Sequence, residues 1–80
     1  MDREEAMQQF RKIVEEKLEG VDPVTVTDST KIAALGDELD VKEILMTVED
    51  FLSIELTDTE FKDLKTVGQV IDLMVKTKTD

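Results

Sequence analysis

The amino-acid sequence predicts an all-α fold, a bundle of three main helices and one short helix with a long loop between the first two helices. Apolar residues recur every three or four positions in three segments, which is the spacing of one face of an α-helix. Each of these segments begins at a residue that commonly caps helices. Because 80 residues have room for one hydrophobic core, we interpret residues 1–80 as a single domain.

The first predicted helix covers about residues 3–18 and is followed by a long connection over residues 20–37. Asp2 and Glu5 have the spacing of a capping box, and Gly20 with the later proline ends the helix. The expected core face consists of Met7, Phe10, Ile13, Val14 and Leu18. We predict an extended loop after it, because a lone strand would have no partner. The loop's apolar residues are expected to pack over the bundle: Val21, Val24, Val26, Ile32 and Leu35.

The other helices are predicted over residues 38–52, 57–64 and from 66 onward. Their cap signals are Asp37, Thr57 with Glu60, and Thr66 with Gln69. The second helix has an apolar stripe of Val41, Ile44, Leu45, Val48, Phe51 and Leu52. The final helix should direct inward Val67, Val70, Ile71, Met74 and Val75. It should end in a polar tail that carries lysines.

The chain is strongly acidic, with 20 acidic residues against 10 basic ones and a formal net charge of −10. Such a surface repels nucleic acids and anionic lipids, so a basic patch on a protein partner fits it best. The absence of Cys and His excludes disulfides, thiolate catalysis, zinc fingers and the usual general base. With no long apolar run and no signal-peptide core, we expect a monomeric cytoplasmic protein that does not insert into membranes.

The order of the elements resembles the acyl carrier proteins, and short motifs extend the resemblance over nearly the whole chain. Residues 28–36 (DSTKIAALG) are similar to the family's loop segment, which ends in Leu-Gly. Residues 39–50 look like its second helix, and residues 54–58 (IELTD) and 66–72 (TVGQVID) resemble later family segments. The resemblance implies a protein of fatty-acid or polyketide biosynthesis that is not itself an enzyme.

The family carries 4′-phosphopantetheine on the Ser of a Leu-Gly-x-Asp-Ser-Leu-Asp motif, and this sequence departs from that motif. Residues 35–40 read LGDELD, so one residue is missing and Glu38 occupies the position of the Ser. Attachment uses a hydroxyl oxygen to form a stable phosphodiester, whereas a carboxylate could form only a labile acyl phosphate. We therefore expect no cofactor. The chain's two serines, Ser29 and Ser53, are expected to be loop and cap residues.

The missing serine leaves two hypotheses open. The first is a non-catalytic module that docks on protein partners and is not phosphopantetheinylated. The alternative is a genuine acyl carrier protein whose attachment serine is altered here or lies elsewhere. The resemblance assigns docking of basic partner surfaces to Asp37, Asp40, Glu43, Met46, Glu49 and Asp50. The acid cluster Asp37, Glu38, Asp40 and Glu43 lacks the ligand pattern of a calcium loop, so we expect no metal site.

Overall fold

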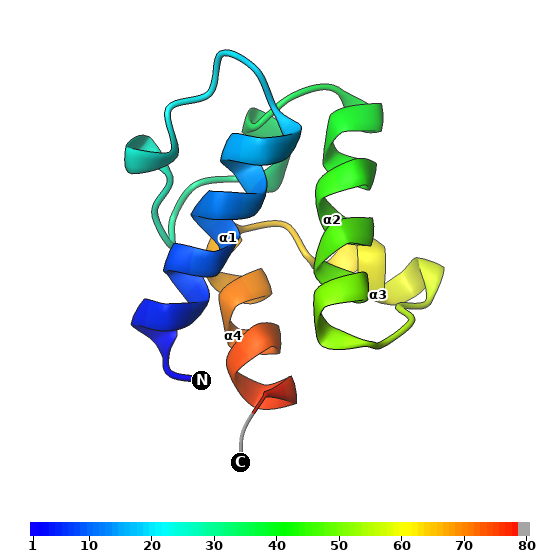
Figure 1. Cartoon of the computed structure of the whole chain (residues 1–80). Coiled ribbons are helices and arrows are strands. Elements are labelled where there is room, and N and C mark those ends of the chain that lie inside the picture. The colour runs from blue at the N-terminus through cyan, green and yellow to red at the C-terminus, as the bar shows by residue number, and fades with distance from the viewer. Residues whose placement is uncertain (79–80) are drawn as a thin grey trace.

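The computed structural model describes residues 1–78, in which four α-helices form a bundle (Figure 1). The helices are α1 (Arg3–Lys17), α2 (Glu38–Leu52), α3 (Asp58–Asp63) and α4 (Val67–Thr77). The start of the chain and the end of α4 meet at one end of the bundle, where the N-terminal amine of Met1 donates to the carbonyl of Lys78 at 3.0 Å. The predicted all-α bundle of three main helices and one short helix is confirmed.

Each of these helices begins with a capping box. The cap side chain accepts the backbone N–H three residues later, and the side chain of that later residue accepts the N–H of the cap. The pairs are Asp2 with Glu5, Asp37 with Asp40, Thr57 with Glu60, and Thr66 with Gln69. A cap side chain is worth about 1 kcal/mol relative to alanine. These local signals explain why the predicted start of α2 agrees with the structure.

The core is built by α1, α2, α4 and the long loop, with α1 packed against both α2 and α4. Its helical members include Phe10, Ile44, Ile71 and Met74, which are fully buried. The short helix α3 contributes no buried residue. It is the least firmly packed helix of the four, because partly buried side chains such as Phe61 provide its apolar contacts.

The long loop covers the core only in part, and it contains two 3₁₀ turns, η1 (Pro23–Thr25) and η2 (Ile32–Ala34). Of the loop residues expected to pack over the bundle, four are buried or partly buried: Val21, Val26, Ile32 and Leu35. Val24 is 76% exposed, so the prediction is wrong at that position. The Asp22 carboxylate accepts the Val24 N–H at 3.0 Å and thereby caps the η1 turn, which leaves the valine side chain in solvent.

Backbone hydrogen bonds tie the loop to the start of α4. They run from Ile32 N–H to Lys65 O at 2.9 Å, from Val67 N–H to Thr30 O at 2.8 Å, and from Gly68 N–H to Asp28 O at 2.9 Å. Lys31 and Thr66 form one isolated antiparallel bridge, so this segment is a loop rather than a strand, as predicted. Arg11 of α1 adds a side-chain hydrogen bond to the Val26 carbonyl at 2.7 Å.

Small differences from the prediction occur at the helix ends and on the helix faces. The helix α1 ends at Lys17, one residue early, because Leu18 has an extended backbone although its side chain is buried. Some residues assigned to inward faces are only partly buried: Met7, Val41, Phe51 and Val75. In the predicted polar tail, residues 79–80 lie outside the described residues.

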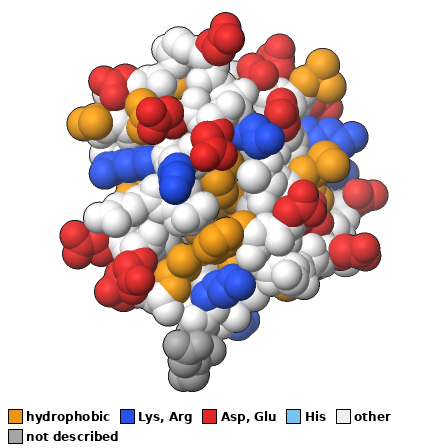
Figure 2. Space-filling view, viewed as in Figure 1, with side chains coloured by type: hydrophobic (Ala, Val, Ile, Leu, Met, Phe, Trp, Pro, Cys, Tyr) orange, Lys and Arg blue, Asp and Glu red, His pale blue; other side chains and the backbone are white. Residues whose placement is uncertain are grey.

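The surface mixes many acidic side chains with scattered basic and apolar ones (Figure 2). Ion pairs among residues 1–78 involve Arg3, which contacts Asp28 at 3.1 Å and also Asp72. These contacts connect α1 to the loop and to α4, and the hydrogen bond to Asp28 contributes most to raising the pKa of Arg3. Among the described residues, no helix is both long enough and apolar enough to cross a membrane.

Candidate functional site

The first turn of α2 is defined by two carboxylates that bind each other's backbone. The Asp37 carboxylate accepts the Asp40 N–H at 2.9 Å, and the Asp40 carboxylate accepts the Asp37 N–H at 3.3 Å. Glu38, the first residue of the helix, lies between them and is exposed. A carboxylate at this position also suits the positive end of the helix dipole. The turn is therefore stabilised locally and presents Glu38 to solvent.

Gly36 precedes this turn because the Asp40 side chain fills the space beside it. A Cβ added at Gly36 would lie 2.5 Å from Asp40 Oδ2 and 2.7 Å from Asp40 Cβ. Both distances are shorter than a real Cβ contact allows. The Leu-Gly sequence before α2 thus has a steric reason, which is the close approach of the capping carboxylate.

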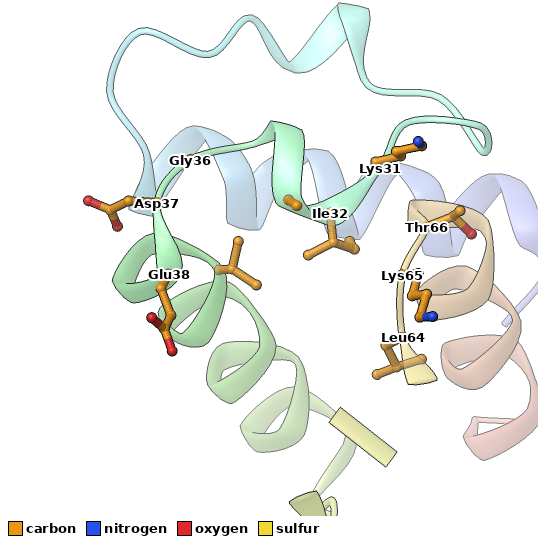
Figure 3. Close-up of a pocket in the computed structure, with 10 residues that line it drawn as sticks. Lys31, Ile32, Gly36, Asp37, Glu38, Leu64, Lys65 and Thr66 are labelled. Atoms are coloured by element: carbon orange, nitrogen blue, oxygen red, sulfur yellow. The ribbon is translucent and has the colours of Figure 1, made fainter. Parts of the chain in front are cut away.

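A pocket of about 740 Å³ opens between the η2 turn, the start of α2 and the segment that joins α3 to α4 (Figure 3). Its lining residues are Lys31, Ile32, Ala33, Gly36, Asp37, Glu38, Val41, Leu64, Lys65 and Thr66. In the close-up, the side chains of Ile32 in the η2 turn and Leu64 in the segment before α4 point toward the space between these two segments. The carboxylates of Asp37 and Glu38 lie at the end opposite to the two lysines and point away from it. The pocket is therefore apolar inside, with charged groups at its rim.

A second pocket of about 390 Å³ lies between α2 and α3. It shares Glu38 and Val41 with the first pocket. Its other lining residues are Lys42, Leu45, Asp58, Phe61 and Lys62. The half-buried Val41 thus lines both pockets, and the beginning of α2 forms part of the wall of each.

The outward face of α2 alternates apolar and acidic side chains. Leu39, Glu43, Met46 and Asp50 recur at spacings of four, three and four residues, which places them on one helix face. Leu39 is 75% exposed and Met46 is 50% exposed. Leu39 was not among the residues assigned to docking from the sequence. The sequence does contain a signal for Leu39. It lies outside the apolar stripe and seven residues, or about two helical turns, before Met46, so both side chains should share one face.

Comparison with known proteins shows to which family the chain belongs. The chain is 30% identical over 79 residues to the acyl carrier protein of Borreliella burgdorferi, covering 98% of this chain and 99% of that protein. It is 34% identical over 76 residues to the acyl carrier protein of Thermotoga maritima, covering 92% and 93%. The chain belongs to the acyl carrier protein family. No family model matches the chain, and no solved structure matches it significantly.

Neither serine of this member of the acyl carrier protein family lies in the first turn of α2. Ser53 caps the opposite end of α2 in a left-handed conformation, with φ of 57°. Ser29 lies in the loop with its Oγ 3.2 Å from Thr27 Oγ1. Neither serine lines the pocket beside Glu38. Both therefore have the loop and cap positions that the sequence predicted.

The residues assigned to docking from the resemblance fall into two groups. Glu43, Met46 and Asp50 are exposed on α2. Asp37 and Asp40 are engaged in the capping box described above. Glu49, which is partly buried, accepts the Leu56 N–H at 2.7 Å and so holds the turn after α2. The structure thus brings half of the assigned side chains to the outward face and uses the other half within the chain. Over residues 1–78, no acidic cluster is arranged to hold a metal ion.

Proposed function

We propose that this chain is an acyl-carrier-protein-like module that docks on protein partners through α2 and carries no 4′-phosphopantetheine arm. The observation that carries the proposal is the identity of the first residue of α2. In the family motif quoted above, the serine follows the Asp and precedes Leu-Asp. Here Glu38 follows Asp37 and precedes Leu39 at the same turn.

The chemistry at Glu38 argues against attachment at this turn. Transfer of the arm from coenzyme A requires an oxygen nucleophile that ends in a stable phosphodiester. The Glu38 carboxylate is exposed and negatively charged, so it repels the pyrophosphate of the donor. Its product would be a mixed anhydride of carboxylic and phosphoric acid, which water cleaves readily. An arm at this residue would therefore not persist.

The outward face of α2 provides the docking surface. Two exposed apolar side chains, Leu39 and Met46, supply area that a partner can bury, and the acids beside them select a basic surface. Residues 38–56 hold six acids and one base, so the electrostatic attraction is concentrated on α2 and the turn after it. Partners of this kind are enzymes of fatty-acid or polyketide biosynthesis, which the chain binds as a monomer without catalysing a reaction itself.

The alternative function is that of a genuine acyl carrier with an altered or relocated attachment serine. The names of the relatives favour it, because they are called acyl carrier proteins. The missing residue beside Glu38 favours the unmodified module, because a simple substitution of the serine would not shorten the motif. Both functions use the same fold and the same α2 face, so only a chemical test separates them.

The test is intact-mass spectrometry of the protein after incubation with coenzyme A and a promiscuous phosphopantetheinyl transferase. We expect the wild-type mass to be unchanged. The matched variant Glu38→Ser restores the sequence Asp-Ser-Leu-Asp at residues 37–40, and we expect it to gain one phosphopantetheine. An established carrier protein in the same reaction verifies the transferase. A phosphopantetheine on any side chain of the wild-type protein would show that the alternative function is correct.

A further inference from the structure

Methionine is the most readily oxidised type of side chain in this protein. The sequence has no Cys, His, Trp or Tyr, and its four methionines are Met1, Met7, Met46 and Met74. Peroxides convert the thioether of methionine to a sulfoxide, and reductases can reverse this change. Reversible oxidation of this chain by a peroxide therefore occurs at one of these four sulfur atoms.

The fold covers the four methionines to different extents. Met74 is fully buried, and Met1 and Met7 are partly buried and pack against the core. Met46 is 50% exposed, and within residues 1–78 it belongs neither to the core nor to the partly buried side chains packed against it. Because susceptibility to oxidation follows exposure, Met46 should react first.

The helix neighbours of Met46 leave it open to an uncharged oxidant. The residues one turn before and after it on α2 are Lys42, Glu43, Glu49 and Asp50, which are all polar. Carboxylates repel an anionic oxidant, but hydrogen peroxide is uncharged and is not repelled in this way. The acidic face therefore favours hydrogen peroxide over anionic oxidants at this position.

From its exposure and its place on the α2 face, we infer that Met46 is an oxidative modification site at which hydrogen peroxide weakens docking. The thioether sulfur donates an electron pair to one oxygen of the peroxide, and the O–O bond breaks. The other oxygen leaves as water after it takes up a proton, and the S–OH group loses its proton to give the sulfoxide. The sulfur is oxidised by two electrons and the peroxide is reduced. The inference rests on the proposed function, because it requires α2 to be the docking face.

The sulfoxide would change the docking face without changing the core. Leu39 and Met46 are the exposed apolar side chains of this face, and oxidation makes one of them polar. A sulfoxide oxygen that a partner buries loses its hydrogen bonds to water, which opposes docking. Since half of the Met46 side chain remains for a partner to cover, we expect the loss to weaken capture about fivefold. Oxidation of Met7 or Met74 would instead place a polar group against the core and lower stability.

The site is tested by a time course of the full chain with hydrogen peroxide, stopped with catalase and analysed by peptide mass spectrometry. We expect the sulfoxide to form first at Met46, later at Met1 and Met7, and last at Met74. The same time course in concentrated urea is the control. There the four rates should become similar, because the fold no longer covers any of the sulfur atoms.

The effect on docking is measured with two probes. One is an immobilised ketosynthase of bacterial fatty-acid biosynthesis, and the other is a resin that carries cationic groups on an apolar support. We expect the oxidised chain to be captured about fivefold more weakly and to elute earlier, with an unchanged far-UV circular dichroism spectrum. Methionine sulfoxide reductases with a thiol should restore both readouts. Met46→Leu should respond to peroxide in neither readout, relative to the same variant untreated, whereas Met7→Leu should respond like the wild type.

Three results would each overturn the inference. These are native-state oxidation of another methionine as fast as that of Met46, equal retention of the oxidised and reduced chains on the resin, and an equal loss in Met46→Leu. The peptide map and the resin require no enzyme. A reduced chain that the ketosynthase does not capture would therefore refute the proposed docking, whereas equal capture before and after oxidation of Met46 would refute only this inference.

Discussion

Replacing Gly36 by alanine tests whether the start of α2 is fixed by the close contact with Asp40. At most glycines without a positive φ, an alanine stabilises a protein by about 0.4–1 kcal/mol through the unfolded chain. At Gly36 the added Cβ would lie 2.7 Å from Asp40 Cβ. The Asp40 Cβ is fixed by the helix backbone, so rotation of its side chain cannot relieve this contact. Either the first turn of α2 or the preceding loop must shift.

The expected cost follows from these contacts. Overpacking of this kind costs about 1–3 kcal/mol. Displacing the Asp40 carboxylate also removes its hydrogen bond with the Asp37 N–H, at a further cost of about 1 kcal/mol. After subtraction of the unfolded-chain gain, we expect Gly36→Ala to lower the free energy of unfolding by about 2 kcal/mol. For a domain of this size, that loss lowers Tm by about 10 °C.

Urea unfolding followed by far-UV circular dichroism measures this loss. The double variant Gly36→Ala with Asp40→Ala removes the 2.5 Å contact with Oδ2 but keeps the Cβ contact. Its total loss should therefore be smaller than the sum of the two single losses. A Gly36→Ala protein as stable as the wild type, or more stable, would show that the unfolded-chain effect dominates. The steric explanation of the Leu-Gly sequence would then be wrong.

Three further predictions concern the core, the loop and the docking face. Truncating the fully buried Phe10 to alanine should cost about 3–5 kcal/mol in the free energy of unfolding, measured by urea denaturation. Gly68→Ala places a Cβ 2.9 Å from the Asp28 carbonyl oxygen, which accepts the backbone N–H of residue 68. This close contact should strain that hydrogen bond, so hydrogen exchange of the residue 68 amide should become faster in the variant. Reversing the charges of the exposed Glu43 and Asp50 to lysine should weaken capture of a carrier-binding enzyme, with a larger effect at low salt.

Each of these three predictions has a contrasting measurement. For the core, Val24→Ala removes an exposed valine and should leave stability within about 0.5 kcal/mol of the wild type. For the loop, an unchanged amide exchange rate at residue 68 in Gly68→Ala would show that the hydrogen bond to the Asp28 carbonyl is not strained. For docking, lysines at Glu15 and Glu16 change the net charge equally on an exposed part of α1. Equal capture by the two reversed proteins would indicate that net charge, not the α2 face, determines binding.

The sequence predicts the helix starts well because each capping box is a local interaction. A side chain and an amide three residues apart decide the start, so Thr57 and Thr66 could be assigned without knowing the tertiary structure. The loop was harder to predict, because valine spacing alone does not show which side chains reach the core. Val24 belongs to a turn that is capped by Asp22, and the side chain is consequently exposed.

The candidate site was only partly predictable for the same reason. The position of Glu38 can be taken from the sequence, because it depends on the order of residues before one helix. The role of Glu49 could not, since its hydrogen bond to the Leu56 N–H depends on how the chain turns after α2. The pocket also depends on tertiary structure, because its walls come from the loop, from α2 and from the segment after α3.

In the first turn of α2, the residues that stabilise the helix start differ from the residue at the attachment position. Its capping box is formed by the carboxylates of Asp37 and Asp40, whereas the residue between the cap and Leu39 only needs to be compatible with a helix start. A serine and a glutamate both satisfy that condition, and the glutamate also interacts favourably with the helix dipole. We therefore expect Glu38→Ser to change stability by less than about 1 kcal/mol. If this substitution restored attachment while leaving the fold intact, the loss of the hydroxyl group would by itself account for an unmodified protein with the carrier fold.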